Sequence, residues 1–143
     1  MIHFLSHSAA ETMAFGSQFS ADLKENSIVC FFGDLGAGKT TFIKGMVQAF
    51  AKEKPISVNS PTFVYLNIYE GSKSIYHFDL YRLHGVDEFL SMGFDEYLFA
   101  GGICCIEWSE RIEVLLPPDC ICVRISHEAE ECRRIAINFG KPL

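Results

Sequence analysis

The feature that most constrains this chain is a glycine-rich stretch, GDLGAGKT, at residues 33–40. It directly follows the apolar run SIVCFF at 27–32, which is typical of a strand buried on both faces of a parallel sheet. From about residue 39 to 51, apolar side chains recur at helical spacing, at Ile43, Met46, Val47, Phe50 and Ala51. A strand, a glycine loop and an amphipathic helix in this order predict an α/β fold.

The glycine stretch fits the pattern G-x-x-x-x-G-K-[ST], with Gly33, Gly38, Lys39 and Thr40 at the fixed positions. Backbone N–H groups of such a loop turn inward and form a concave anion site, to which the following helix adds its positive end. We predict that Lys39 reaches the β- and γ-phosphates of a nucleotide and that the Thr40 hydroxyl ligates Mg²⁺. The alternative, a flexible turn with an accidental lysine, is disfavoured by the flanking strand and helix. The loop residues expected to contact the nucleotide are Gly33, Asp34, Leu35, Gly36, Ala37, Gly38, Lys39, Thr40 and Thr41.

Two acidic residues are candidates for catalysis or metal binding. Glu107 ends the apolar run at 103–106, and ligands of parallel sheets bind beyond the carboxyl ends of the strands. Asp79 lies in the β-rich stretch 75–81, and an acid on an otherwise apolar strand needs a reason because unpaired burial is costly. For Asp79 the alternative is a pairing with Arg82 or a capping role.

Three further features remain open from the residues alone. His77 has aromatic neighbours, so we expect a packed or hydrogen-bonded residue rather than a base. The loop SVNSPTF at 57–63 is either a segment that senses the γ-phosphate or a linker with a turn at Ser60–Pro61. Trp108 is expected to pack in the core or at an interface, although a place beside the nucleotide is the alternative.

The rest of the chain completes one predicted domain over residues 1–143, with a mixed, mostly parallel central sheet flanked by helices and additional antiparallel strands. The remaining expected strands are an edge strand at 2–5, a hairpin of 63–70 and 75–81, and an antiparallel pair at 120–126 and 133–139. The remaining expected helices begin with one at about 9–23, opened by a Ser8/Glu11 capping box. Two short helices follow, one capped by Asp87 and interrupted at Gly93, and one within 108–116. The stretch HEAEECRR at 127–134 is interpreted as an exposed turn.

Composition narrows the function. The net charge of −6 argues against a protein that grips nucleic acid unaided, because phosphate contacts need clustered Lys and Arg. No run approaches the roughly 20 apolar residues of a membrane span, and no Lys or Arg precedes Lys24 as a secretory signal would require, so we expect no membrane association and a cytoplasmic location. The six cysteines form no C-x-x-C pair, so we expect reduced buried thiols and no zinc.

Taken together, these motifs resemble the TsaE (YjeE) family of small P-loop ATPases. The matching segments, in family order over almost the whole chain, are GDLGAGKTTF at 33–42, SPTF at 60–63, HFDLYRL at 77–83, GFDEYL at 93–98 and IEWSER at 106–111. The resemblance implies ATP binding with Mg²⁺ and hydrolysis that is weak alone and dependent on two partners, TsaB- and TsaD-like proteins. It implies a role in threonylcarbamoylation of adenosine 37 in tRNAs that read ANN codons, with the tRNA held mainly by the partners.

The resemblance also implies roles for individual residues. Thr40 and Glu107 would ligate Mg²⁺, Asp79 would position the metal or the attacking water, and Thr62 would lie near the γ-phosphate as a switch-like residue. Trp108 and Arg82 would lie beside the active site, and Thr12 near the base or ribose. The basic pair Arg133–Arg134 matches the family only loosely.

Two other classes of function remain as alternatives. A stand-alone small-molecule kinase usually needs a lid, and no arginine-rich lid can be found among only five arginines. A non-catalytic, nucleotide-gated binding module would carry the same phosphate loop but no hydrolysis.

Overall fold

The computed structural model describes residues 1–34, 36–51, 58 and 64–140. Within these residues a single sheet of seven strands has the order β1-β7-β6-β2-β5-β4-β3. The strands are β1 (Ile2–Ser6), β2 (Ile28–Phe32), β3 (Leu66–Tyr69), β4 (Ile75–Asp79), β5 (Ile103–Glu107), β6 (Ile121–Ala129) and β7 (Cys132–Phe139).

The sheet is parallel in its centre and antiparallel at both edges. Strand β2 pairs in parallel with β5 and β6, and β4 pairs in parallel with β5. The pairs β1–β7, β6–β7 and β3–β4 are antiparallel. This confirms the mixed sheet predicted from the buried apolar runs and the two hairpins, and it joins both hairpins to the same sheet.

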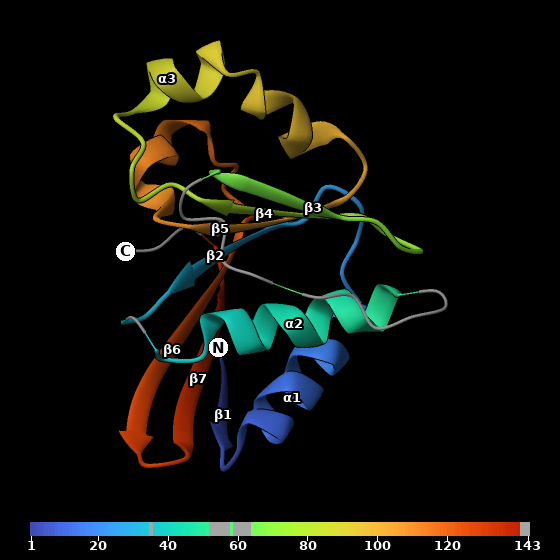
Figure 1. Ribbon diagram of the computed structural model, residues 1–143, viewed down its shortest axis with the longest axis vertical. Coiled ribbons are helices and arrows are strands. Elements are labelled where there is room, and N and C mark those ends of the chain that lie inside the picture. The colour runs from blue at the N-terminus through green and yellow to red at the C-terminus, as the bar shows by residue number, and fades with distance from the viewer. Residues whose placement is uncertain (35, 52–57, 59–63, 141–143) are drawn as a thin grey trace.

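Helices cover both faces of the sheet (Figure 1). Helices α1 (Ala9–Ala21) and α2 (Lys39–Phe50) lie on one face, and α3 (Val86–Ser91) lies on the other with the 3₁₀ helices η1 (Phe94–Phe99) and η2 (Ser109–Leu115). Each layer encloses its own apolar core, one between the sheet and α1/α2 and one between the sheet and α3, η1 and η2. None of the described helices is long and apolar enough to cross a membrane.

Helices α1 and α2 pack closely because both carry a glycine at their contact. A Cβ on Gly16 would collide with the backbone carbonyl of Phe42, and a Cβ on Gly45 would collide with that of Met13. The predicted start of α1 is confirmed, since the Ser8 side chain accepts a hydrogen bond from the Glu11 backbone N–H at 3.0 Å.

Two local expectations are wrong. The N-cap of α3 is Gly85 without a side-chain bond, so Asp87 lies inside the first turn, where its charge still favours the helix dipole. The stretch 127–134 is mostly strand, because β6 continues to Ala129 and β7 begins at Cys132. Backbone pairing along this hairpin, with His127 opposite Arg133, outweighs the polar composition that indicated a turn.

Candidate nucleotide-binding site

A hollow of about 690 Å³ lies at the carboxyl ends of β2, β4 and β5. This is the edge of a parallel sheet where ligands bind. Most of the predicted site residues line it: Gly33, Asp34, Gly36, Gly38, Lys39, Thr40, Thr41, Asp79, Glu107 and Trp108, together with Tyr81. Residues far apart in the sequence thus meet at one place.

The loop between β2 and α2 owes its shape to its glycines. Gly38 is the N-cap of α2 with a φ of 112°, a left-handed conformation that side chains rarely adopt. At Gly33 a Cβ would collide with the backbone carbonyl of Ile125 in β6. Gly33 is therefore small because the neighbouring strand packs against it, a reason that the phosphate pattern alone does not reveal.

Lys39 lies across this loop. Its Nζ donates a hydrogen bond to the Gly33 carbonyl at 2.6 Å and lies 3.4 Å from Oε1 of Glu107. Since Lys39 is the first residue of α2, its ammonium group adds to the positive end of the helix. The arrangement favours an anion held between the loop and the side chain.

Asp79 and Glu107 are direct neighbours in the parallel register of β4 and β5. Each is only 6% exposed, yet both line the hollow. The Asp79 carboxylate also accepts a hydrogen bond from the Tyr81 backbone N–H at 3.0 Å. The capping interpretation of Asp79 and the site interpretation are thus compatible, because the bond to Tyr81 fixes the carboxylate at the edge of the hollow.

Glu107 is held as a carboxylate by two neighbours. Burial raises its pKa, but the hydrogen bond and charge of His77 and the charge of Lys39 outweigh burial, so the pKa lies below the ordinary value. His77 Nε2 is 2.8 Å from Glu107 Oε2. The expectation of a packed, hydrogen-bonded His77 is thereby confirmed, but its contact with a carboxylate of the hollow was not predicted. The available signal was its place two residues before Asp79, on the same strand face.

An aromatic pair forms the outer wall of the hollow. The rings of Tyr81 and Trp108 have centroids 5.0 Å apart, and Arg111 donates a hydrogen bond to the Tyr81 carbonyl at 3.2 Å. Trp108 is 41% exposed, so of the two expected places, core or interface, the core is wrong, and the ring lines the hollow as the alternative had it. Tyr81 was not predicted as a site residue, although its place directly beyond β4 could have indicated it.

Five predicted residues do not line the hollow or are not described, and one of them, Ala37 of the loop, is buried in the core beneath α2 instead. Thr12 is buried, and its hydroxyl is 2.7 Å from the hydroxyl of Ser6 in β1. Ser6 is in turn opposite Arg133 in the antiparallel pairing of β1 and β7. Arg82 is exposed and does not line the hollow. Leu35 and Thr62, and most of the loop 57–63, lie outside the described residues.

The oxygen donors in the hollow fit Mg²⁺. The Thr40 hydroxyl and the carboxylates of Asp79 and Glu107 line the same space. Magnesium prefers such hard ligands and usually takes only one or two carboxylates, completing its shell with phosphates and water. A dedicated cluster of three or more His, Cys, Asp or Glu is absent among the described residues, and a magnesium–nucleotide site does not need one.

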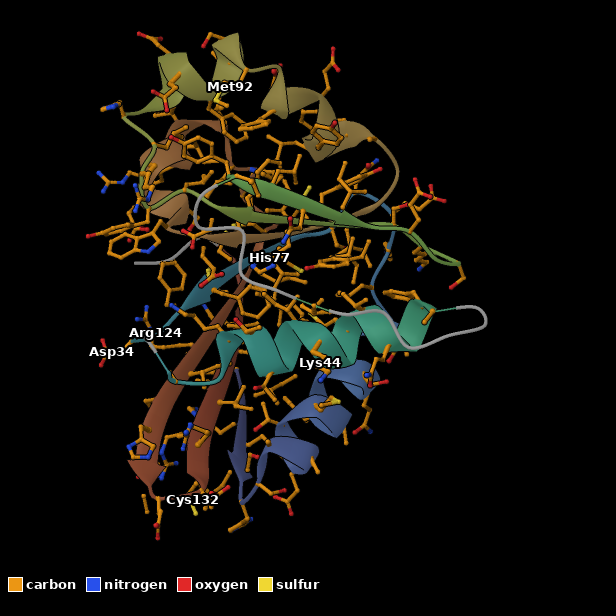
Figure 2. The ribbon with its side chains drawn as sticks, in the orientation of Figure 1. Asp34, Lys44, His77, Met92, Arg124 and Cys132 are labelled. Atoms are coloured by element: carbon orange, nitrogen blue, oxygen red, sulfur yellow. The ribbon has the colours of Figure 1, made fainter. Side chains whose placement is uncertain are left out.

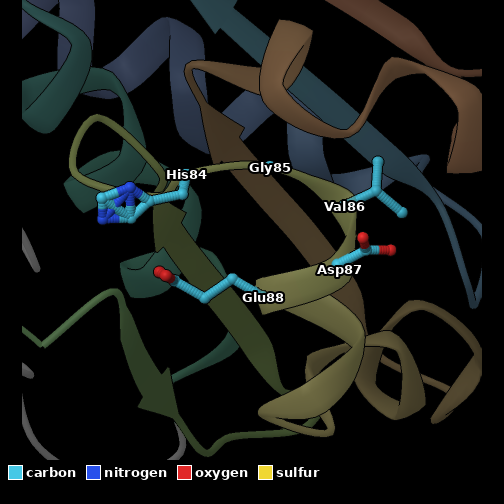
Figure 3. Close-up of a pocket in the computed structure, with 5 residues that line it drawn as sticks. All are labelled: His84, Gly85, Val86, Asp87 and Glu88. Carbon is cyan, nitrogen blue, oxygen red and sulfur yellow. The ribbon is translucent and has the colours of Figure 1, made fainter.

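A second, smaller hollow of about 290 Å³ lies at the start of α3 (Figure 3). His84, Asp87 and Glu88 are among the residues that line it. Two carboxylates already lie at this helix end, so the hollow does not attract a further anion.

The fold and the hollow define the class: an α/β P-loop protein with a nucleotide-type phosphate loop, a loop lysine and two acids at the strand ends. The family model "Threonylcarbamoyl adenosine biosynthesis protein TsaE" matches residues 6–135. The chain therefore belongs to the TsaE family, as the sequence motifs indicated.

Individual relatives agree with this assignment. Proteins called "tRNA threonylcarbamoyladenosine biosynthesis protein TsaE" are 35% identical in Treponema pallidum, over 93% of this chain and 97% of the relative, and 43% identical in Rickettsia prowazekii, over 83% and 82%. The crystal structure of Bacillus subtilis YdiB is 28% identical and superposes with a TM-score of 0.79, covering 98% of this chain and 86% of YdiB. The predicted α/β fold is thereby confirmed.

Proposed function

We propose that this chain binds ATP with Mg²⁺ in the hollow at β2, β4 and β5 and hydrolyses it as a component of tRNA threonylcarbamoyladenosine biosynthesis. Membership of the TsaE family supports the pathway. The observation that carries the ATPase activity is the meeting of Lys39, Asp79 and Glu107 around one hollow at the phosphate loop.

Each group has a role that its position favours. The loop amides and the Lys39 ammonium bind the phosphates and stabilise the charge that develops during hydrolysis. Thr40 and Glu107 would hold Mg²⁺, which supplies positive charge to the β- and γ-phosphate oxygens. Asp79, fixed by its bond to Tyr81, orients the attacking water or a metal-bound water. Thr62 would sense the γ-phosphate, as the family resemblance implies.

The composition of the hollow supports slow hydrolysis without partners. Lys39 is the only basic residue among those that line it in the described part of the chain. P-loop enzymes that turn over quickly commonly receive an additional arginine, often from another protein. We therefore propose that TsaB- and TsaD-like proteins complete the site.

The tRNA contacts belong to those partners in this proposal. With a net charge of −6, the chain is poorly suited to bind a polyanion unaided. The modified nucleotide would be adenosine 37 of tRNAs that read ANN codons, as the family resemblance implies. The cytoplasmic location expected from the sequence is part of the same proposal.

The direct test is ATP turnover measured with the chain alone and then with both partner proteins. We expect a marked rise on adding the partners, and loss of that activity in Lys39→Ala. Lys44→Ala is the matched control, because Lys44 is on the same helix but does not line the hollow (Figure 2). Phosphate transfer to a small acceptor without partners would favour the kinase alternative, and binding without hydrolysis under any condition would favour the gating module.

A cellular test addresses the pathway. Depletion of the protein should lower threonylcarbamoyladenosine in total tRNA, measured by mass spectrometry of nucleosides. An undiminished level in cells with no second copy of the gene would contradict the pathway assignment.

A further inference from the structure

His77 is a fully buried histidine in contact with the candidate site (Figure 2). It lies on β4, on the same face as Ile75, which belongs to the core beneath α2. Its Nε2 is 2.8 Å from Oε2 of Glu107 on the adjacent strand.

The direction of this hydrogen bond follows from chemistry. An ionised carboxylate can only accept, so Nε2 of His77 carries the hydrogen. This holds whether or not Nδ1 is also protonated. Nδ1 itself is buried without a hydrogen-bond partner among the described residues, so the contact with Glu107 is the polar contact that orients the ring.

The two carboxylate oxygens of Glu107 have different neighbours. Oε2 accepts from His77, and Oε1 lies toward Lys39 at 3.4 Å. If Oε2 were released, the carboxylate would be able to rotate and bring both oxygens to the Lys39 ammonium. The ion pair of Lys39 and Glu107, which now involves Oε1 at 3.4 Å, would then engage both carboxylate oxygens and leave neither for the metal.

We propose that His77 is a positioning residue, which holds the Glu107 carboxylate so that one oxygen remains directed into the hollow for Mg²⁺. This inference rests on the proposed function, since it assumes that Glu107 serves the magnesium–nucleotide complex. Partners in the second shell of a metal commonly change its affinity by roughly 10- to 100-fold. His77 occupies that place relative to Glu107.

The test compares two amides of different reach. In His77→Gln the side-chain N–H extends to about the position of Nε2, whereas in His77→Asn it stops near Nδ1 and cannot reach Glu107. His84→Asn is the control, because His84 is exposed and does not line the hollow at the phosphate loop. ATP binding is followed through the fluorescence of Trp108, the single tryptophan, which lines this hollow.

Binding is titrated with magnesium and also in EDTA. For His77→Asn we expect about a tenfold or greater rise in the Mg²⁺ concentration needed for half-maximal tightening of ATP binding. His77→Gln should restore much of the difference, and His84→Asn should match the unmodified protein. Affinity for ATP in EDTA should be the same in all four, because the phosphate loop is untouched.

A second measurement detects the hydrogen bond directly, and its main result comes from the unmodified protein. Long-range ¹⁵N–¹H spectra of the unmodified protein should show Nε2 of His77 protonated, with a shift of this resonance in Glu107→Gln. A His77 ring with hydrogen on Nδ1 alone would overturn the proposal. So would a normal magnesium requirement in His77→Asn, or equal losses in the asparagine and glutamine variants with and without magnesium.

The two levels of the proposal fail in different ways. If magnesium has no effect on ATP binding by the unmodified protein, the proposed function falls and the role of His77 falls with it. If magnesium tightens binding in the unmodified protein and in His77→Asn alike, only the role of His77 is refuted.

Discussion

The two faces of strands β4 and β5 carry opposite kinds of side chain at the same end of the sheet. Toward α2, Asp79 and Glu107 line the hollow, and the buried His77 contacts Glu107. Toward α3 and η1, Phe78 and Ile106 belong to an apolar core. Neighbouring residues of one strand therefore belong separately to the candidate site and to the core, because successive side chains point to opposite faces.

On the apolar face, replacement should act on stability. Phe78 is fully buried and packs edge-to-face or tilted against Phe89, Phe94 and Tyr97. We expect Phe78→Ala to lower the free energy of unfolding by about 3–5 kcal/mol, the usual cost of emptying such a site. Urea denaturation measures it. A loss below 1 kcal/mol would show that this face is not the structural one.

On the polar face, replacement should act on activity. Removing the Lys39 ammonium leaves the charge developing on the phosphates without its protein cation, so Lys39→Ala should lower ATP turnover by about 10²–10³-fold. Steady-state phosphate release in the presence of the partners measures it. ATP turnover of Lys44→Ala should stay within about twofold of that of the unmodified protein. A similar loss of turnover in both variants would show that the effect of Lys39→Ala does not come from its place in the hollow.

A smaller effect is expected at Asp79. Asparagine keeps an oxygen that can accept from the Tyr81 N–H, so Asp79→Asn should preserve both fold and ATP affinity while lowering turnover by about 100-fold, the lower end of what a positioned proton acceptor contributes. Binding and turnover must be measured on the same preparation. If ATP affinity falls as much as turnover, Asp79 holds the bound nucleotide rather than orienting water.

A pH titration sharpens the comparison further. The pKa of Glu107 lies below its ordinary value of 4.5 in the folded protein, because His77 and Lys39 outweigh burial. As the pH falls, Glu107 is therefore protonated in the unfolded chain before it is protonated in the folded protein. The stabilisation from its carboxylate is present above about pH 4.5 and is lost as the pH drops through the folded-state pKa.

The measurement is the free energy of unfolding of the unmodified protein and of Glu107→Gln between pH 7 and pH 3. The difference between them should shrink as the pH falls below about 4.5. A difference that stays constant over this interval would show that the interactions of Glu107 do not depend on its charge.

The smallest effect concerns the cysteines of the apolar face. Burial raises the pKa of the Cys30 and Cys104 thiols to about 12, whereas Cys132 lies at partial exposure in the hairpin β6–β7. Because the thiolate is the reactive form, iodoacetamide at pH 8 should modify Cys132 well before the other two. Peptide mass spectrometry gives the order, and early labelling of Cys30 would indicate that this core opens readily.

The sequence alone determined the local structure at the site. The spacing of glycines, Lys39 and Thr40 predicted a phosphate loop between a strand and a helix, and both elements occur where expected. Strand alternation placed His77 and Asp79 on one face. These features depend on backbone conformation and side-chain period, which act over a few neighbouring residues.

Only the tertiary structure decided which of those residues meet. The parallel register of β4 and β5 brings Asp79 beside Glu107 and puts His77 within hydrogen-bonding distance of it. The same packing shows that Gly33 is small because of Ile125, and that Trp108 lies at the wall of the hollow instead of the core. Register and packing depend on contacts between distant segments, and local spacing carries no information about them.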